Sequence, residues 1–266
     1  MAKVRLDALL ARRGLFESRT RAAASVMAGH VVLGAGRLPA AKPGQLVDEG
    51  IEVDVRQRPP YVSRGGVKLA NALTRTGLEV RGRRALDVGA ATGGFTDCLL
   101  SHGATGVIAV DVAYGELDWR LRTDSRVTVI ERCNARHLTP GQLPYRADLA
   151  TIDVSFISLA KVLDPVLACL AGTFDCLALV KPQFEVGRRS VGRGGVVRDP
   201  RVRRAALLGA GEAALSLGAS VLGFAPSGLP GPKGNLETFM WLGEAGRPGG
   251  AATVADLEAM AAEAEP

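Results

Sequence analysis

A stretch of small residues, ALDVGAATGGFTD at 85–97, constrains the fold more than any other part of the sequence. An apolar run ends there in Asp87 and Gly89. Small residues follow as far as Gly93 and Gly94, after which a segment typical of a helix begins. A strand that turns tightly into a helix brings bare backbone N–H groups close to a ligand. The stretch therefore predicts a ligand-binding turn between a strand and a helix.

The spacing of the glycines in this turn distinguishes between classes of ligand. A dinucleotide loop reads G-x-G-x-x-G and needs a glycine at Ala91, whereas this loop reads G-x-x-x-G-G. The carboxylate of Asp87 at the end of the strand would repel a phosphate group and attract a cationic ligand. The loop therefore argues against a dinucleotide-dependent dehydrogenase and favours a positively charged ligand.

From residue 84 onward, runs typical of strands alternate with runs typical of helices. The strand-like runs lie at 85–89, 106–112, 127–132, 149–154, 176–180, 220–226 and 238–242, and the helix-like runs at 67–76, 94–102, 116–122, 159–171 and 199–217. Strands separated by helices form a mostly parallel sheet that is covered on both faces. Ligands bind such sheets at the carboxyl ends of the strands, so the residues that follow each strand are candidate site residues.

Polar side chains follow several of these strands. Asp111 lies near the end of the second strand, where an acid can accept hydrogen bonds from ribose hydroxyls. Asn134 follows the third strand, where its amide can pair with the edge of an adenine. Asp153 ends the fourth strand and Lys181 follows the fifth. Because the carboxyl ends of parallel strands meet at one edge, we expect these side chains to lie close together.

Two lysines and two acids are expected to converge at this edge, namely Lys68, Asp153, Lys181 and Glu237. One interpretation is a set of structural salt bridges. The other is proton transfer, because all but Lys68 fall at or beside the rim, where a structural ion pair has no special reason to be. A lysine that is partly buried beside a second ammonium releases its proton more readily and can then accept one from a sugar hydroxyl. The residues alone leave both interpretations open.

Residues 1–56 form a separate unit. A helical stripe begins near Val4 and stops at Gly14, a second helix at 19–28 can be capped by Ser18, and short strands are expected at 31–33, 45–47 and 51–55. Basic side chains cluster in this unit: Arg5, Arg12, Arg13, Arg19, Arg21 and Lys42. They indicate either a solvated helical face or a surface that reads the shape and backbone of RNA.

A second basic segment follows the fifth strand. Residues 184–204 carry seven arginines, among them Arg188 and Arg189, and are rich in glycine. Such a segment suits a mobile loop over a polyanion, although a solvated loop without a ligand has the same composition. The formal net charge of +6 permits nucleic-acid binding without requiring it.

Composition excludes several classes of protein. No apolar run approaches the ~18 residues of a transmembrane helix, and the N-terminus lacks the apolar segment of a secretory signal. The four cysteines form no C-x-x-C pair, which indicates reduced thiols rather than zinc ligands or disulfides. We therefore expect a cytoplasmic protein with no bound metal and no stable membrane association.

Four motifs together resemble one family. SRGGVKL, LDVGAATGGFTD, LVKPQFEVGR and GPKGNLETF, with the arginine-bearing front region, are similar to the TlyA family over residues 3–244. The loop at 85–97 resembles motif I of class I methyltransferases. The four converging charged residues resemble the K-D-K-E tetrad of FtsJ-like ribose 2'-O-methyltransferases. Residues 1–56 resemble the RNA-binding fold of ribosomal protein S-four.

The resemblance implies an α/β fold, a Rossmann-like class I methyltransferase with a seven-stranded, mostly parallel sheet, preceded by a small α+β RNA-binding domain. The implied domains are an RNA-binding domain at 1–56, a linker at 57–66, a methyltransferase domain at 67–245 and a tail at 246–266. The linker reads Arg58-Pro59-Pro60-Tyr61-Val62, where relatives carry an Arg-x-Trp-Val-like segment, so no linker function is carried over.

The implied activity is methyl transfer from S-adenosyl-L-methionine to the ribose 2'-hydroxyl of cytidine in 16S and 23S rRNA, within the 30S and 50S subunits. By resemblance, Lys181 is the base, Asp153 orients it, and Lys68 and Glu237 complete the hydrogen-bonded set. The implied cofactor residues are Asp87, Gly89, Gly93, Gly94, Phe95, Asp111 and Asn134. The target nucleotide and the oligomeric state do not follow from the sequence.

Two other classes of protein compete with this interpretation. A base methyltransferase of the amino type carries Asn/Asp-Pro-Pro-Tyr/Phe after the fourth strand, where this chain reads Asp153-Val154-Ser155-Phe156. Methylation at carbon 5 needs a nucleophilic cysteine, and none follows the fourth or fifth strand. A membrane-lysing protein remains an alternative because the family is also labelled hemolysin. Leakage of liposomes with pure protein distinguishes that class.

Overall fold

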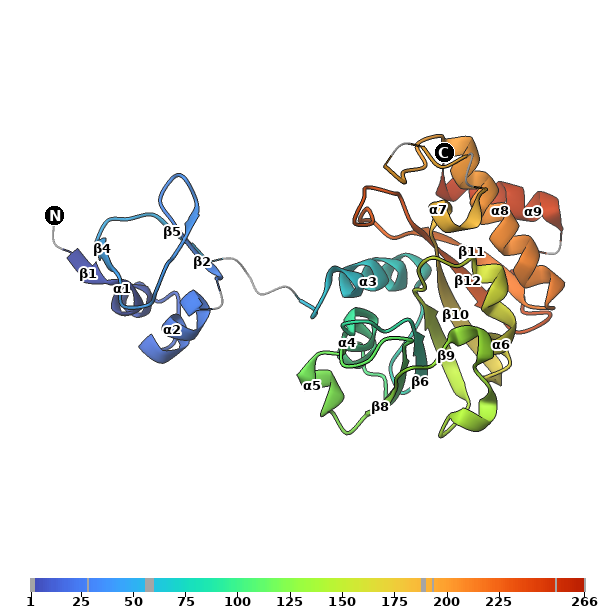
Figure 1. The fold of residues 1–266 in the computed structure, drawn as a ribbon, viewed down its shortest axis with the longest axis horizontal. Coiled ribbons are helices and arrows are strands. Elements are labelled where there is room, and N and C mark those ends of the chain that lie inside the picture. Colours follow the sequence, from blue (N-terminus) through green and yellow to red (C-terminus); the bar gives the residue numbers. More distant parts are fainter. Residues whose placement is uncertain are drawn as a thin grey trace. The chain divides into compact units, whose positions relative to one another are not determined.

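The computed structural model describes residues 3–27, 29–55, 60–187, 190–192, 194–251 and 253–265. The chain divides into two compact units, Met1–Pro59 and Pro60–Pro266, which are described separately (Figure 1). The candidate RNA contacts Arg188 and Arg189, and the linker residues 56–59, lie outside the described residues.

The first unit packs two short helices against short strands. Its elements are β1 (Lys3–Arg5), α1 (Leu6–Arg12), α2 (Arg19–Met27), β2 (Val31–Leu33), β3 (Leu38–Pro39), β4 (Leu46–Asp48) and β5 (Val53–Val55). β1 pairs with β4, and β2 lies between β3 and β5. Leu6, Leu9 and Leu10 of the predicted stripe are buried in a small core with Val26 and Val47. β1 and β3 were not predicted, because two or three residues show no periodicity.

The second unit contains one seven-stranded sheet in the order β11-β12-β10-β9-β6-β7-β8. The strands are β6 (Arg84–Val88), β7 (Gly106–Val110), β8 (Val127–Ile130), β9 (Ala147–Ile152), β10 (Leu170–Val180), β11 (Ser220–Pro226) and β12 (Thr238–Gly243). β12 runs antiparallel to both of its neighbours, and the other adjacent pairs are parallel. The direction in which the chain adds strands reverses between β6 and β9, and ligands bind at such a switch point.

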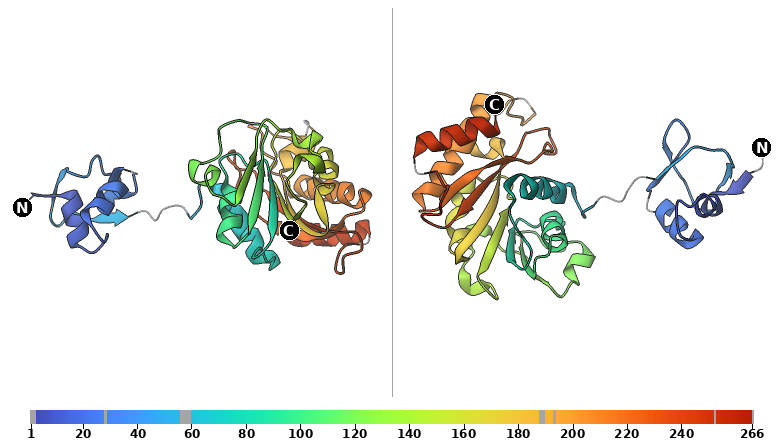
Figure 2. Two further views of the ribbon diagram at one scale, coloured as in Figure 1. Left: turned by 90° about the horizontal axis from the view of Figure 1, so that it is seen from below. Right: turned by 180° about the vertical axis from the view of Figure 1, so that it is seen from behind.

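Helices cover both faces of this sheet, as predicted (Figure 2). One face is covered by α3 (Arg64–Thr76), α4 (Gly94–Ser101) and α5 (Trp119–Arg122), and the other by α6 (Leu163–Leu167), α8 (Pro200–Ser216) and α9 (Val254–Ala264). Strand residues alternate between the two cores: Ala85 packs with α3 and α4, whereas Leu86 and Val88 pack with α6 and α8. Burial on both faces explains why these strands are mostly apolar.

Several predicted boundaries differ from the structure, and two of the differences have a clear local cause. The helix expected at 159–171 ends at Leu167, after a 3-10 turn at Leu159–Lys161, and β10 begins at Leu170. Gly172 and Thr173 are poor helix formers, and Leu170 pairs with Ala147 of β9 before the register shifts. The helix expected from residue 67 begins at Arg64, because the side chain of Ser63 accepts a hydrogen bond from Gly65 N.

Candidate active site

The turn after β6 has the predicted form. Gly89 and Gly93 adopt positive φ angles of 84° and 94°, and Gly93 caps the N-terminus of α4. A Cβ at Gly89 would overlap the backbone carbonyl of Asp153, and one at Gly93 would overlap the side chain of Leu121. Both positions therefore require glycine on conformational and steric grounds.

Asp87 lies beneath this turn rather than in a cavity. Its side chain is fully buried and accepts hydrogen bonds from Thr96 Oγ1 (2.7 Å) and Thr151 Oγ1 (3.0 Å). Burial raises the pKa of the Asp87 carboxyl to about 6, although both hydroxyl hydrogen bonds act in the opposite direction. Asp87 therefore supports the turn from within the sheet, and its closeness to the ligand stays a prediction.

A cavity of about 450 Å³ opens at the carboxyl ends of β6, β7, β8 and β9. Gly89, Asp111 and Asn134, three of the predicted cofactor residues, line it. Asp111 accepts hydrogen bonds from Ala91 N (2.8 Å) and Ala113 N (2.7 Å), which fixes the carboxylate at the rim. Each carboxylate oxygen has a second lone pair with which to accept a ribose hydroxyl.

The predicted cofactor residues Gly93, Gly94 and Phe95 do not line this cavity. Gly94 allows close approach of two helices, because a Cβ there would overlap Ser63 Oγ at the start of α3. Phe95 is buried in the core, with its ring centroid 5.6 Å from that of Phe239. These three residues build the turn and its support.

A second, larger cavity of about 710 Å³ lies beside the first. It contains all four predicted tetrad residues, Lys68, Asp153, Lys181 and Glu237. Three residues at the end of β9 and directly after it line both cavities, namely Asp153, Ser155 and Phe156, whereas Val154 between them lines only the smaller one. Groups on this shared wall can contact ligands in both cavities.

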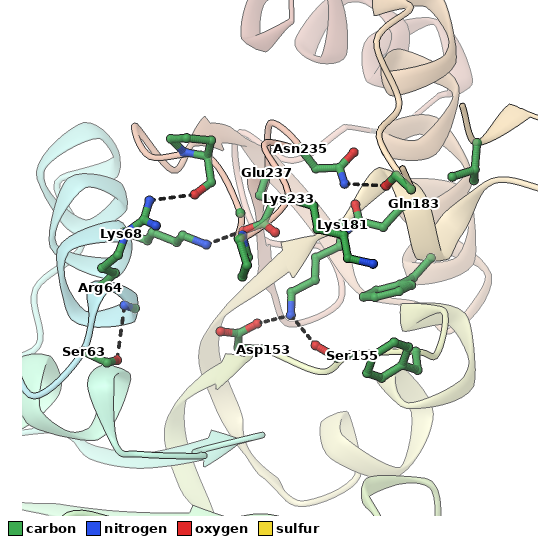
Figure 3. Close-up of a pocket in the computed structure, with 18 residues that line it drawn as sticks. Ser63, Arg64, Lys68, Asp153, Ser155, Lys181, Gln183, Lys233, Asn235 and Glu237 are labelled. Carbon is green, nitrogen blue, oxygen red and sulfur yellow. Dashed lines mark hydrogen bonds and ion pairs between the residues drawn. The ribbon is translucent and has the colours of Figure 1, made fainter. Parts of the chain in front are cut away.

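The tetrad forms two ion pairs rather than one cluster (Figure 3). Lys181 Nζ lies 2.6 Å from Asp153 Oδ1 and donates a hydrogen bond to Ser155 Oγ at 2.9 Å. Lys68 Nζ pairs with Glu237 Oε2, and the Glu237 side chain is only 1% exposed. Asp153 of the first pair lines both cavities, whereas Lys181 and both members of the second pair line only the larger cavity.

The segment between β11 and β12 is tied to α3 along one wall of the larger cavity. Arg64 Nη2 donates to Pro230 O at 3.0 Å, and Asn71 Nδ2 donates to Ser227 O at 2.9 Å. The Lys68–Glu237 pair lies between these two contacts in the sequence of α3. This arrangement explains how a lysine far from the sheet residues in sequence reaches the rim.

The loops after β9 and β10 are joined by a half-buried carboxylate. Glu185, at the end of α7 (Pro182–Glu185), accepts hydrogen bonds from Ser158 Oγ (2.7 Å) and Leu159 N (2.9 Å). Burial raises the pKa of the Glu185 carboxyl. The contact holds the segment that carries Lys181 against the segment that carries Asp153.

Sequence reasoning missed two residues on the shared wall. Phe156 is 91% exposed and adopts a φ angle of 63°, which is rare for an aromatic residue. Its ring lies 5.2 Å from that of Phe184, centroid to centroid. Ser155 contacts Lys181 directly. The signal for both was their position directly after a strand that ends in an acid.

The basic residues of the first unit are exposed but mostly paired. Asp7 accepts from Arg5 at 2.8 Å and pairs with Arg19 at 3.5 Å. Arg5 lowers the pKa of the Asp7 carboxyl to about 2. The remaining contacts are Arg12 with Glu49, Arg13 with the carbonyls of Glu49 and Ile51, and Arg21 with Glu17. Lys42 lies between β3 and β4, with an exposed side chain.

The strand order, the turn and the paired cavities together define a class I methyltransferase that uses S-adenosylmethionine. The cavity at Asp111 and Asn134 fits this cofactor, because it joins a fixed carboxylate and an amide to an apolar lining. The chain belongs to the FtsJ-like methyltransferase family, which matches residues 61–244.

Individual relatives extend over most of the chain. A protein from Mycobacterium tuberculosis named 16S/23S rRNA (cytidine-2'-O)-methyltransferase TlyA is 48% identical over 90% of each chain. Hemolysin A from Brachyspira hyodysenteriae is 36% identical over 88% of this chain and 97% of its own. A solved structure named as a hemolysin, from Streptococcus thermophilus, has a TM-score of 0.74 and 39% identity over 99% of this chain and 96% of its own.

The hemolysin label of some relatives raises the question of membrane insertion. Within the described ranges, every helix is too short or too polar to cross a bilayer.

Proposed function

We propose that this protein transfers the methyl group of S-adenosylmethionine to the ribose 2'-hydroxyl of cytidine in ribosomal RNA of the 30S and 50S subunits. The observation that carries the proposal is the position of Lys181 in the larger cavity, 2.6 Å from Asp153, which lines both cavities. The name and the 48% identity of the Mycobacterium tuberculosis relative support cytidine and the two rRNAs as substrates. A cytoplasmic location accords with a ribosomal substrate.

The chemistry requires that a sugar hydroxyl lose its proton as its oxygen attacks a methyl group. Bound in the smaller cavity, S-adenosylmethionine supplies that methyl group on a sulfonium, which leaves as a neutral thioether. Lys181, in its neutral form, accepts the hydroxyl proton, and Asp153 stabilises the ammonium that results. Asp111 and Asn134 would fix the position of the cofactor. The reaction then depends mainly on the relative positions of the two ligands.

The larger cavity has features that suit a nucleotide. The exposed ring of Phe156 and its neighbour Phe184 offer a surface on which a base can stack. The Lys68–Glu237 pair lines the same cavity and can hydrogen-bond to ribose or phosphate oxygens. Arg64 and Lys233 add positive charge to the lining, which favours the phosphates of RNA.

The first unit contributes affinity rather than chemistry in this proposal. Its exposed guanidinium groups suit contacts to the RNA backbone, which position a protein without reading sequence. Every described residue that lines the cofactor cavity belongs to the second unit.

Transfer of tritiated methyl groups to isolated 30S and 50S subunits tests the proposal. After transfer, nuclease digestion and chromatography should give labelled 2'-O-methylcytidine from both 16S and 23S rRNA. Label on a base would contradict ribose methylation. Label in only one subunit would restrict the proposed substrate to that rRNA.

A further inference from the structure

The two groups that contact Lys181 Nζ differ in geometry. The carboxylate of Asp153 is closer, with Oδ1 at 2.6 Å. Yet among the described residues Asp153 Oδ1 is buried and accepts no hydrogen bond of ordinary directionality. The hydrogen bond with normal geometry goes instead to Ser155 Oγ, at 2.9 Å. Asp153 therefore supplies charge beside the amine, whereas Ser155 determines the direction of an N–H bond.

A neutral lysine amine has two N–H bonds and one lone pair. When one N–H points at Ser155 and the other lies toward Asp153, the lone pair takes the remaining direction. The amine lies in the larger cavity, next to Asp153 and Ser155, and these two residues line both cavities. The Phe184 ring is a looser neighbour, with its centroid 6.0 Å from Nζ. Directional control of the amine therefore rests on the serine hydroxyl.

We propose that Ser155 is a positioning residue for methyl transfer, because it aims the lone pair of Lys181 at the substrate hydroxyl. The inference rests on the proposed function, in which Lys181 is the base. The proton moves from the ribose oxygen to Nζ while the oxygen forms its bond to the methyl carbon. The electron pair of the broken C–S bond remains on sulfur, and the ammonium later releases its proton to solvent.

The surroundings of Ser155 argue against a purely structural role. Its residue is exposed, and within the described ranges its side chain makes no hydrogen bond other than that with Lys181. Nearby Ser158 differs, since its hydroxyl caps the turn at Leu159–Lys161 and donates to Glu185. Loss of the Ser155 hydroxyl should therefore change the orientation of the Lys181 amine and leave the melting temperature unchanged.

Ser155→Ala, Ser155→Thr and the control Ser216→Ala test this inference. Ser216 is an exposed serine at the end of α8 and lines neither cavity. Ser216→Ala therefore removes the same hydroxyl group away from the site. With saturating cofactor and subunits, we expect Ser155→Ala to lower the single-turnover rate about 10- to 100-fold, the effect of one hydrogen bond to a charged group. Calorimetric affinity for S-adenosylmethionine and filter-binding affinity for subunits should not change. Ser155→Thr should restore most of the rate, because it keeps the hydroxyl.

A double-mutant cycle with Lys181→Ala separates positioning from other roles. If Ser155 acts through Lys181, then Ser155→Ala should cost nothing further in the Lys181→Ala background. If Ser155→Ala lowers the rate equally in both backgrounds, Ser155 does not act through Lys181. If Ser155→Ala has the wild-type rate while Lys181→Ala is impaired, Ser155 has no positioning role. Either result would overturn the inference about Ser155 and leave the proposed role of Lys181 intact. A wild-type rate for Lys181→Ala would instead overturn the role of Lys181 in the proposed function, and the positioning role with it.

Discussion

The backbone carbonyl of Asp153 lies directly against Gly89, so that no side chain fits at Gly89. Asp153 N also donates to Val88 O at 2.8 Å, which joins the end of β9 to the end of β6. One acid of the larger cavity and one glycine of the smaller cavity therefore share a backbone contact. A change at either position disturbs both cavities at once.

Cofactor binding is best tested at Asp111 rather than at Gly89. Gly89→Val would introduce strain at a φ angle of 84° and overlap Asp153, so a loss of binding there would not separate ligand contact from misfolding. Asp111→Asn keeps the size of the side chain and removes its charge. We expect affinity for S-adenosylmethionine to fall about 10- to 100-fold by calorimetry.

The matched control is Asp124→Asn, which changes an acid paired with Arg126 in a turn away from both cavities. That variant should bind the cofactor as the wild type does. Unchanged affinity for Asp111→Asn would remove Asp111 from the cofactor site.

Asp87 should make the stability of the protein depend on pH between about 4 and 6. Its pKa is about 6 in the folded protein and 3.8 without the surrounding structure, so the folded state binds more protons across this range. The free energy of unfolding therefore falls as pH rises from about 4 to 6 and does not change with this group above pH 6. Ionisation of Asp87 in the folded protein lowers it by about 3 kcal/mol. Asp87→Asn should remove this dependence.

Melting temperatures of wild type and Asp87→Asn across pH 4 to 7 measure the effect. The asparagine can keep one hydrogen bond to each of Thr96 and Thr151, so the comparison isolates the charge. The melting temperature of Asp87→Asn should rise relative to that of the wild type as pH rises. A constant difference over this range would mean that Asp87 does not titrate there.

The sequence predicted the sheet and the proximity of Asp153 to Lys181 because both follow from where strands end. Asp153 and Lys181 meet since β9 and β10 are adjacent and parallel. The pairing of Lys68 with Glu237 depends instead on contacts between α3 and the segment before β12. Strand periodicity contains no information on such contacts.

Other parts of the site could not be predicted for physical reasons. Burial of Asp87 under two threonines depends on Thr151 of the neighbouring strand, which no local pattern relates to it. The φ angle of Phe156 depends on loop geometry. The pairing of Arg5 and Arg19 with one carboxylate likewise depends on how α1 and α2 pack, so the arginines appeared freer in sequence than they are.

Phe156→Ala should lower the affinity or kcat/KM for RNA without lowering the stability of the fold. The ring is 91% exposed, so its removal costs little burial, and stacking of a base on an aromatic ring is worth about 1–3 kcal/mol. We expect affinity or kcat/KM for subunits to fall about 5- to 100-fold, with the melting temperature unchanged. Phe156→Tyr keeps the ring and should retain activity. Equal activity of the alanine and tyrosine variants would exclude stacking.

RNA binding by the first unit is tested most simply at Lys42. Replacing both Arg5 and Arg19 would leave the Asp7 carboxylate, whose side chain is 8% exposed, without either cation and would destabilise the unit. Lys42→Ala avoids that effect. We expect weaker binding to subunits and a slope of log affinity against log salt reduced by about 1.

The control for Lys42 is Lys161→Ala, an exposed lysine of the second unit on the turn at Leu159–Lys161. It removes the same charge and should leave the salt dependence as it is. An equal slope for wild type and Lys42→Ala would place the RNA surface elsewhere on the protein.

Lys181→Ala distinguishes proton transfer from a structural ion pair. We expect the single-turnover rate to fall about 100-fold or more at a near-normal melting temperature, because general-base catalysis contributes that much. A structural pair makes the opposite prediction, since removing one partner of a buried pair costs about 3–5 kcal/mol of stability. A large fall in melting temperature with a modest loss of rate would therefore favour the structural role.

Lys181→Arg is the sharper probe of the same residue. Arginine keeps a positive charge beside Asp153 and preserves the ion pair, yet it does not lose its proton near neutral pH. We therefore expect normal melting, normal affinity for cofactor and subunits, and a rate as low as that of the alanine variant. Single-turnover methylation of subunits measures the rate. Near-wild-type activity in Lys181→Arg would mean that the lysine only positions the substrate, and the proton must then leave by another route.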